Sequence, residues 1–424
     1  MRDLLPPETA LWNFVEAAVR DVFRDYNFRE IRTPILEETQ LFARSVGEST
    51  DIVSKEMYTF EDRTRAQSEK TQSLTLRPEA TAGIVRAYIE HKLWERGLNK
   101  LYCLGPMFRR ERPQKGRYRQ FYQIDAEVIG PASAGSDSPA RDAELLEMLA
   151  TLLDRLGIAN WTLQLNSVGC PADREHYNQV LKKALEPVVG QMCEDCQRRA
   201  VTNPLRVFDC KVPEDQPIIE KLPRIGDYLD EPCREHFEEV QEILKAVGVP
   251  YTLNNRLVRG LDYYTRTAFE FTHGALGAQN AILGGGRYDG LSESLGGPNA
   301  PGIGFAIGED RLVLALSESA EALACTPDVY IAPLGSGMNR EAARLARELR
   351  RHDVILELGD ENFRLKKSLE LASRMNARFA LIVGENEVKS DTFALKNLST
   401  GEQVSVPRAE LPSRIQKSGD RATG

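Results

Sequence analysis

The stretch Met107–Glu127, MFRRERPQKGRYRQFYQIDAE, says more about the fold than any other part of this chain. Two runs that favour β-strands flank a loop with four basic residues: Arg112, Lys115, Arg117 and Arg119. At a period of two, the second run places apolar side chains on one face: Tyr122, Ile124, Ala126 and Val128. Its other face is mostly polar and holds Arg119, Phe121, Gln123, Asp125 and Glu127.

This polar strand face predicts a ligand. A polar group buried without a partner costs roughly 1–3 kcal/mol, so amide and carboxyl groups in a row favour a polar molecule above them. The alternative is a hairpin of an antiparallel sheet with one face in water. The positive charge of the loop predicts an anionic ligand such as phosphate, because forked guanidinium groups bind phosphate well.

Length and composition narrow the class of protein. A chain of 424 residues predicts two or three domains, and 42% hydrophobic with 28% charged residues is ordinary for a globular protein. The sequence contains no run of about 18 apolar residues, so we expect no membrane helix, and its N-terminus lacks an apolar signal core. Seven cysteines do not indicate a disulfide framework, so we expect a cytoplasmic protein. At a net charge of −8, a polyanion would have to be bound by local basic patches.

Several elements are predicted before and after the hairpin. Pro6 and Pro7 precede an amphipathic helix. Residues 28–42 form an extended run in which Pro34 indicates a strand edge or an interface. Residues 74–91 indicate a strand that ends at Pro78 and then a helix, and an acidic helix is expected at about 140–156.

The second half of the chain has two regions of different character. Residues from about 171 to 249 are helix-rich and indicate an insertion, after which strand patterns return. Residues 325–327 mark a linker, and strands then alternate with helices in a small βαβαβ unit with a predicted parallel sheet.

Three segments could bind a ligand, each with a structural alternative. Residues 77–81, RPEAT, place a carboxylate and a hydroxyl at a strand-to-helix turn, but such residues also stabilise helix N-termini. Residues 259–264, RGLDYY, suit a bend beside a flat or cationic ligand, or a surface turn. The glycines of residues 284–289 and 302–311 could admit a nucleotide, yet they fit neither G-x-G-x-x-G nor a phosphate loop.

These motifs together resemble the class II aminoacyl-tRNA synthetases. Residues 108–111, FRRE, resemble the motif 2 F-R-x-E, residues 302–311 resemble motif 3, and residues 27–42 resemble the motif 1 dimer strand. Within this class, RGLDYY and residues 117–123, RYRQFYQ, resemble the histidyl-tRNA synthetases, and the resemblance covers essentially the whole chain. The first residues lie inside a Gly-Met-Arg-Asp-like segment of that family, which a short strand usually precedes, so we expect part of an N-terminal strand to be absent.

The resemblance implies an α+β fold and an activity. The expected fold has an antiparallel six-stranded class II catalytic sheet with helices, a helical insertion and a C-terminal α/β anticodon-binding domain. The catalytic domain would span residues 1–325, with the insertion at about 171–249, and the anticodon-binding domain would span residues 326–424. The implied reaction is the ATP-dependent attachment of L-histidine to its tRNA through a histidyl-adenylate.

The resemblance also implies roles for individual residues. Arg109 and Arg259 would be catalytic and, with Glu111 and Arg311, would bind ATP, which arrives with Mg²⁺. The residues expected to bind histidine are Glu79, Ala80, Thr81, Arg109, Gln123, Glu127, Arg259, Tyr263 and Tyr264. Of these, Glu79, Thr81 and Gln123 would surround the amino group, and Glu127 with the two tyrosines would hold the imidazole.

The expected partners are the tRNA for histidine, histidine, ATP and a second copy of the chain in a homodimer, with no membrane. The acceptor end of the tRNA would meet the motif 2 loop at Arg112, Gln114, Lys115 and Arg117. A helix of the C-terminal unit carries a basic stripe that could contact RNA or remain solvated: Arg340, Arg344, Arg347 and Arg351.

The cysteines offer one possible metal site. Cys193-x2-Cys196, with Cys210 and Cys233, could hold zinc. One close pair with two distant single cysteines is a weaker pattern than two close pairs, so we expect unliganded thiols and no tightly bound metal or cofactor.

Two other functions fit parts of the sequence. A regulatory subunit of ATP phosphoribosyltransferase binds histidine as a signal, but such paralogues typically lack the anticodon-binding domain and part of the arginine set. A tRNA-binding module would leave Glu79, Gln123 and Glu127 without a role. The presence of Arg109, Arg259 and Arg311 with a full C-terminal unit favours the synthetase.

Overall fold

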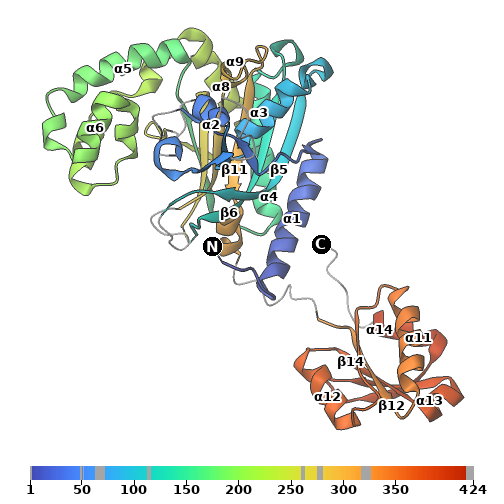
Figure 1. Ribbon diagram of the computed structural model, residues 1–424. Coiled ribbons are helices and arrows are strands. Elements are labelled where there is room, and N and C mark those ends of the chain that lie inside the picture. The colour runs from blue at the N-terminus through green and yellow to red at the C-terminus, as the bar shows by residue number, and fades with distance from the viewer. Residues whose placement is uncertain are drawn as a thin grey trace. The chain divides into compact units, whose positions relative to one another are not determined.

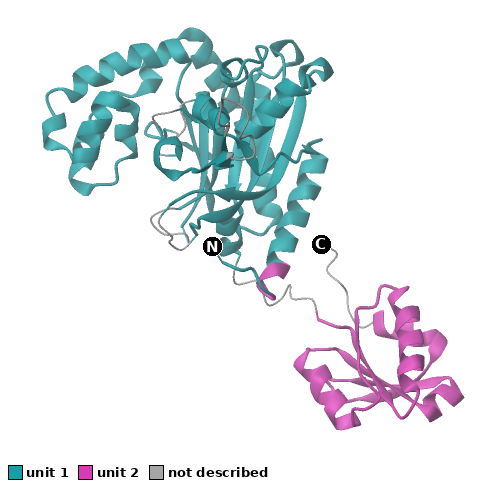
Figure 2. Ribbon diagram, viewed as in Figure 1, with its two compact units in different colours: residues 1–5, 11–319 teal, residues 6–10, 320–424 magenta. Residues whose placement is uncertain are grey.

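The hairpin predicted around residues 107–127 is present in a computed structural model of the chain. Strand β5 (Asn99–Phe108) pairs antiparallel with β6 (Gln120–Ile129), with Cys103 opposite Asp125. The structure describes residues 2–47, 50, 52–62, 72–111, 116–258, 263–274, 280–316 and 326–416. The chain divides into two compact units, residues 1–5 with 11–319 and residues 6–10 with 320–424 (Figure 2).

The hairpin belongs to an eight-stranded mixed sheet in the order β1-β5-β6-β11-β10-β9-β7-β8. Its other strands are β1 (Arg29–Glu30), β7 (Trp161–Ser167), β8 (Tyr251–Leu253), β9 (Thr265–His273), β10 (Ala281–Arg287) and β11 (Gly302–Gly308). The prediction of a six-stranded antiparallel sheet was wrong, because β1 joins β5 and β8 joins β7 in parallel at the two edges. These edge strands have two and three residues, too few to show a period of two.

Helix α1 (Glu8–Asp25) covers the apolar face of the hairpin. The rings of Trp12 and Tyr122 have centroids 5.3 Å apart, and Phe23 packs edge-on against Tyr102 and Phe305. The amphipathic helix predicted after Pro6 and Pro7 is therefore confirmed, and it leaves the opposite face of the sheet for polar side chains.

Helix α3 (Thr81–Glu90) lies over that polar face. It follows β4 (Gln72–Leu76), as predicted, and β4 pairs with β2 (Leu36–Glu38) and β3 (Tyr58–Asp62) in a three-stranded sheet. The extended run expected over residues 28–42 ends early, because α2 (Thr39–Val46) begins at Thr39. Leu41, Phe42 and Val46 form the buried side of α2, a helical spacing that overrides the strand pattern. The π-helix η1 (Ile52–Glu56) precedes β3.

Residues 171–246 form helices between β7 and β8, in the region where an insertion is predicted. They are α5 (Pro171–Leu185), α6 (Glu194–Thr202), α7 (Gln216–Ile219) and the 3-10 helices η5 (Val189–Gln191), η6 (Pro204–Asp209), η7 (Pro213–Asp215) and η8 (Ile225–Tyr228), followed by α8 (Glu231–Ala246). Helices α5 and α6 project away from the large sheet (Figure 1). With η6 they share a separate core that includes Leu181, Val207 and Phe208. Helix α8 returns to pack against α4 (Pro139–Arg155), the acidic helix predicted at about 140–156.

Short helices complete the first unit: η3 (Leu93–Arg96), η4 (Ala132–Ala134), α9 (Leu291–Ser294) and α10 (Glu309–Ala315). Among the described residues, none of the helices is long and apolar enough to cross a membrane.

The second unit contains the predicted βαβαβ arrangement. Strand β12 (Val329–Leu334) pairs in parallel with β13 (Leu356–Leu358) and with β14 (Phe379–Gly384). The sequence did not predict β15 (Thr392–Asn397) and β16 (Gln403–Pro407), which extend the sheet antiparallel. The helices are α11 (Met338–Arg350), α12 (Leu365–Arg374), α13 (Glu385–Ser390), η11 (Arg408–Glu410) and α14 (Leu411–Gln416).

Candidate active site

A cavity of about 320 Å³ lies on the polar face of the large sheet. Its volume is in the range of small-molecule pockets. The predicted site residues that line it are Glu79, Thr81, Arg109, Glu111, Arg117, Gln123, Glu127, Tyr263, Tyr264 and Arg311. The hairpin, the 77–81 turn, the tyrosine pair and the glycine-rich strands therefore meet at one place, as their combination predicted.

Glu127 is the most enclosed carboxylate of the cavity. Its side chain has no exposed surface, and it accepts hydrogen bonds of 2.6 Å from the hydroxyls of Thr81 and Tyr288. Burial raises the pKa of Glu127 to about 8, although these two hydrogen bonds oppose the shift. A cationic or N–H ligand next to this carboxylate would favour its ionised form.

Two glycines of β11 make room for the side chains of Glu127 and Tyr288. A Cβ atom on Gly304, which lies opposite Glu127 in the sheet, would be 1.6 Å from the Glu127 carboxylate. A Cβ atom on Gly302 would be 2.4 Å from the ring of Tyr288. The sequence indicated that these glycines could let the protein backbone approach a nucleotide closely; in the structure Gly304 and Gly302 make room for the side chains of Glu127 and Tyr288.

Two groups beside Glu127 lack hydrogen-bond partners among the described residues. Among the described residues, no hydrogen bond reaches either carboxylate oxygen of Asp125 or Oε1 of Gln123. Both residues are buried, at 1% and 7% exposed. Burial, followed by repulsion from Glu127 and Glu79, raises the pKa of Asp125 well above its usual value. The structure buries this face, so the wet-face alternative for the hairpin is wrong, and these buried oxygens suit a polar ligand.

Glu79 has a structural contact as well as a place in the cavity. Its carboxylate accepts a hydrogen bond of 3.1 Å from the backbone N–H of Ala82, in the first turn of α3. Burial raises its pKa despite the backbone hydrogen bonds. Glu79 therefore stabilises the helix N-terminus, as the structural alternative predicted, and it also lines the cavity. Ala80 is buried in the core beside Ile84 and is not among the lining residues.

Arginines line the cavity together with these carboxylates. Arg109 donates from Nε to the carbonyl of Pro78 at 2.9 Å and lies over the ring of Phe121. Glu111 accepts from Arg117 at 3.1 Å, and Arg311 donates to the carbonyl of Ala281 at 2.9 Å. Guanidinium groups fixed in this way are suited to binding phosphate.

The remaining predicted residues divide into two groups. Tyr263 and Tyr264 pack ring to ring at 4.8 Å, and Tyr263 also contacts the ring of Tyr288. Four predicted residues lie outside the described residues: Arg112, Gln114, Lys115 and Arg259. Sequence reasoning missed Asp125, Glu270 and Tyr288 as cavity residues, although Asp125 was visible on the polar face of the strand.

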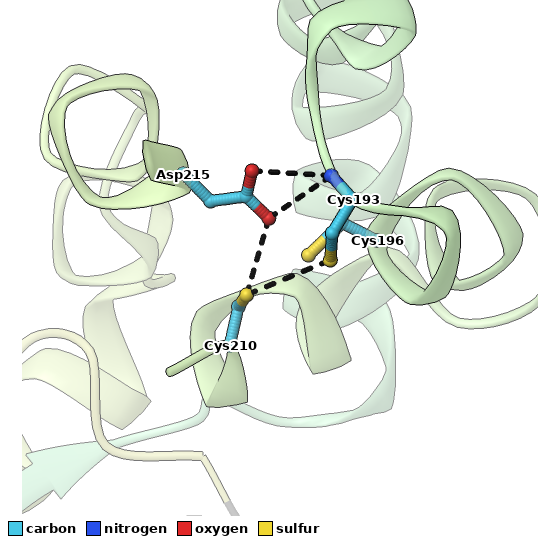
Figure 3. Close-up of side chains that lie close together, drawn as sticks. All are labelled: Cys193, Cys196, Cys210 and Asp215. Atoms are coloured by element: carbon cyan, nitrogen blue, oxygen red, sulfur yellow. Dashed lines mark hydrogen bonds between the residues drawn. The ribbon is translucent and has the colours of Figure 1, made fainter. Parts of the chain in front are cut away.

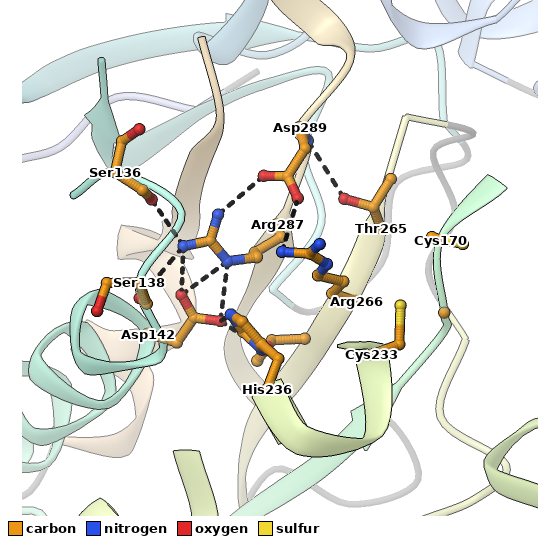
Figure 4. Close-up of polar contacts among 12 residues, drawn as sticks. Ser136, Ser138, Asp142, Cys170, Cys233, His236, Thr265, Arg266, Arg287 and Asp289 are labelled. Carbon is orange, nitrogen blue, oxygen red and sulfur yellow. Dashed lines mark hydrogen bonds and ion pairs between the residues drawn. The ribbon is translucent and has the colours of Figure 1, made fainter. Parts of the chain in front are cut away.

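Arg287, in the glycine-rich segment, is a structural residue. Its guanidinium is fully buried and contacts Asp142 of α4 at 2.8 Å, Asp289 at 2.8 Å and the carbonyl of Ser136 at 2.7 Å (Figure 4). Asp142 also accepts from Thr267 at 2.6 Å. This network joins the sheet to the helix behind it and does not line the cavity.

The cysteines of the predicted zinc set do not all come together. Ligand atoms of Cys193, Cys196 and Cys210 lie within 4.8 Å of one another and of an oxygen of Asp215. Cys233 belongs to a different cluster, near Cys170 in Figure 4, because it lies in the first turn of α8 where that helix returns to the sheet.

Comparisons with known proteins agree with this geometry. Residues 1–312 match the histidyl-tRNA synthetase family, and residues 328–418 match the anticodon-binding domain family. The chain is 67% identical over 424 residues to the histidine–tRNA ligase of Koribacter versatilis, covering 100% of this chain and 96% of the relative.

Solved structures also resemble the chain along its length. The apo histidyl-tRNA synthetase of S. aureus has a TM-score of 0.79 at 37% identity and covers 98% of each chain. A Bacillus halodurans protein described as an ATP phosphoribosyltransferase regulatory subunit/histidyl-tRNA synthetase has a TM-score of 0.62 at 20% identity, covering 91% of this chain and 97% of its own. At that identity the likeness concerns the fold alone. The family match over the catalytic unit and the full-length relative together show that the chain belongs to the histidyl-tRNA synthetase family.

Proposed function

We propose that the cavity binds histidine and ATP together and joins them as histidyl-adenylate. The overall reaction follows from the family: the chain attaches L-histidine to tRNA in an ATP-dependent reaction. One observation supports the residue assignment above all others, the buried Glu127 carboxylate next to the unpartnered oxygens of Asp125 and Gln123. A site with buried polar groups rejects ligands that leave them unpaired.

The carboxylate side of the cavity is proposed to bind histidine. Glu127, held by Thr81 and Tyr288, accepts from the imidazole N–H, and Tyr263 and Tyr264 lie against the ring. Gln123, Glu79 and Thr81 surround the ammonium group, with Ala80 in the same turn. Asp125, which the sequence did not predict, adds a second buried carboxylate for this cation.

The guanidinium groups are proposed to bind ATP as its Mg²⁺ complex. An oxygen of the histidine carboxylate attacks the α-phosphorus, a P–O bond forms, and the bond to pyrophosphate breaks. Arg109 and Arg259 stabilise the charge that develops on the phosphate, and Glu111 and Arg311 complete the ATP site. No general base is needed, because the attacking carboxylate is already ionised.

The two units are proposed to act on different ends of the tRNA. The catalytic unit, residues 1–325, meets the acceptor end through the motif 2 loop, of which Arg117 lies within the described residues. The anticodon-binding unit, residues 326–424, presents the exposed arginines of α11 and its end, namely Arg340, Arg344, Arg347 and Arg351. Arg344 is 2.5 Å from Glu341, so that contact would have to loosen before Arg344 could bind phosphate.

We also propose that the protein is a homodimer and works in the cytoplasm, where its substrate tRNA is used. Large apolar side chains in the motif 1 region support the dimer, since Leu36, which begins the edge strand β2, and the preceding Ile35 are 48% and 43% exposed. Exposed apolar residues at a sheet edge are typical of contact surfaces. Light scattering on the parent and on Ile35→Glu should show dimer and monomer, respectively.

Aminoacylation of purified tRNA with labelled amino acids tests the proposed function. We expect ATP-dependent charging of the histidine tRNA with histidine and background levels with other amino acids. A folded protein that binds histidine but does not charge tRNA would favour the regulatory role and refute the proposal.

A further inference from the structure

A cluster of three thiols and one carboxylate lies in the helical region between β7 and β8. The sulfurs of Cys193 and Cys210 are 3.9 Å apart, and the Cys210 sulfur is 3.2 Å from Oδ2 of Asp215 (Figure 3). Cys196 completes the group, and one ligand atom from each of the four residues lies within 4.8 Å of the others. Cys196, Cys210 and Asp215 are almost fully buried, at 0%, 4% and 1% exposed.

These separations suit a tetrahedral metal ion. With zinc–sulfur bonds of about 2.3 Å, two sulfurs of a tetrahedral site are about 3.8 Å apart, close to the Cys193–Cys210 distance. Three thiolates and one carboxylate are among the ligands that zinc binds, and the predominance of sulfur disfavours magnesium and calcium.

The surrounding backbone orients the four groups. The N–H of Val212 points at the Cys210 sulfur at 3.4 Å, and the N–H of Cys193 donates to both oxygens of Asp215, at 3.1 and 3.3 Å. Cys193 and Cys196 lie at the N-terminal end of α6, where helix N–H groups favour negative charge. Such outer hydrogen bonds are typical of metal sites, where they orient the ligands and stabilise thiolates.

A metal ion at this position would cross-link separate segments of the helical region. The four residues come from three separate places: the start of α6, the residue after η6 and the end of η7. The elements they would connect are short, and their core is separate from that of the large sheet. A small core of this kind gains most from a covalent or metal cross-link.

The second cluster of cysteines and carboxylates provides a contrast. Cys170, Asp173, Asp230 and Cys233 also lie within 4.8 Å of one another, but only two of them are sulfurs. There the carboxylates act as helix caps, since Asp173 accepts from the N–H of Cys170 and of Asp230, and Asp230 accepts from the N–H of Cys233. Capping of α5 and α8 accounts for this cluster without a metal.

We propose that Cys193, Cys196, Cys210 and Asp215 bind one structural Zn²⁺ ion. Binding releases the thiol protons, because thiolates are the ligands, and it links α6 to the segment around η6 and η7. This revises the sequence-based expectation of unliganded thiols and replaces Cys233 with Asp215 in the ligand set. The proposal does not depend on which amino acid the cavity binds.

The test uses the full-length protein purified under reducing conditions without chelator. Elemental analysis should give one zinc ion per chain. After exchange into Co²⁺, absorption should show thiolate-to-cobalt charge transfer and the visible bands of a tetrahedral site. Absence of both metals from a folded protein would overturn the proposal without reference to any variant.

Variants then identify the ligands. Cys210→Ser and Asp215→Asn should weaken zinc binding by at least on the order of tenfold, since even outer-shell changes cost that much. Asp215→Cys should retain the ion, because it supplies a fourth sulfur. Cys233→Ser is the matched control, a buried clustered cysteine outside the set, and should keep full zinc. Retention of zinc by both Cys210→Ser and Asp215→Asn, or its loss from Cys233→Ser, would contradict this ligand set.

Discussion

Glu127 and Asp125 occupy the same strand face two residues apart, yet their surroundings differ. Glu127 accepts hydrogen bonds from Thr81 and Tyr288, whereas neither oxygen of Asp125 has a partner among the described residues. A carboxylate held by two hydroxyls is fixed in orientation before any ligand arrives. Glu127 is therefore the residue that we expect to set specificity, with Asp125 as an added source of negative charge.

Substitution of Glu127 tests this assignment. Glu127→Ala should weaken histidine binding by about 1–3 kcal/mol and ATP binding much less, because only the imidazole loses its acceptor. Calorimetric titration of each ligand measures both affinities. Glu309→Gln serves as a matched control, since Glu309 is also a buried glutamate with a pKa raised by burial to about 8 but does not line the cavity. Equal losses for both ligands in Glu127→Ala would contradict the assignment.

The raised pKa of Glu127 also predicts a pH dependence of stability. Its pKa is about 8 in the folded protein against an ordinary value of 4.5, so between these pH values only the folded state keeps the proton. The stability contributed by this group is therefore complete below pH 4.5 and falls as the pH rises towards about 8.

Glu127→Gln removes this titration. The melting temperature of the variant minus that of the parent, both measured without ligand, should therefore be larger at pH 8 than at pH 5. Scanning calorimetry at both pH values provides the comparison. A difference that stays constant or shrinks would mean that Glu127 is already ionised in the empty site.

At the scale of elements, the hairpin was predictable because both strands are long and the second one alternates apolar and polar side chains. Ten residues of β6 are enough to separate an apolar face from a polar one, and the structure buries both. Strands β1 and β8 were not predictable, because they are held by neighbours and not by a pattern of their own. The start of α2 at Thr39 was missed because Pro34 and β-favouring neighbours dominated that segment.

Contacts between distant segments explain the other omissions. Tyr288 was visible only as part of a glycine-rich run, and its contact with Glu127 joins residues 161 positions apart. Cys233 has the same chemistry as the other cysteines, and only the return of α8 to the sheet separates it from them. Sequence spacing does not carry this information.

The buried Arg287–Asp142 pair is expected to hold β10 against α4. Arg287→Met should lower the free energy of unfolding by about 3–5 kcal/mol, because it removes the cation that pairs with the buried Asp142 carboxylate. Urea unfolding followed by tryptophan fluorescence measures the loss. Arg344→Met removes an exposed arginine and should change stability little. If Arg287→Met/Asp142→Leu were no more stable than Arg287→Met, the orphaned carboxylate would not be the cause.

At the scale of the whole molecule, the two units have separate cores and separate proposed tasks. The second unit contains its own buried cluster, including Val329, Leu345 and Leu381, and none of the cavity residues. The chain therefore combines the site proposed to activate histidine with a unit that matches the anticodon-binding domain family.

Removal of the second unit should separate the two steps. A chain ending at residue 325 should retain histidine-dependent adenylate formation within a few-fold and lose charging of tRNA by at least on the order of tenfold, through lost RNA contacts. Light scattering must show that the truncated protein keeps the oligomeric state of the parent. Charging at the full-length rate by this protein would refute the anticodon role, and loss of adenylate formation would refute the division of tasks.

The proposed function requires that the carboxylate-lined cavity activates histidine. Its most direct test is amino-acid-dependent exchange of pyrophosphate into ATP by the purified full-length protein, without tRNA. We predict saturable exchange with histidine, background exchange with the other amino acids, and loss of histidine-dependent exchange at limiting histidine in Glu127→Ala. No histidine-dependent exchange by the folded protein, or equal exchange with another amino acid, would contradict the account.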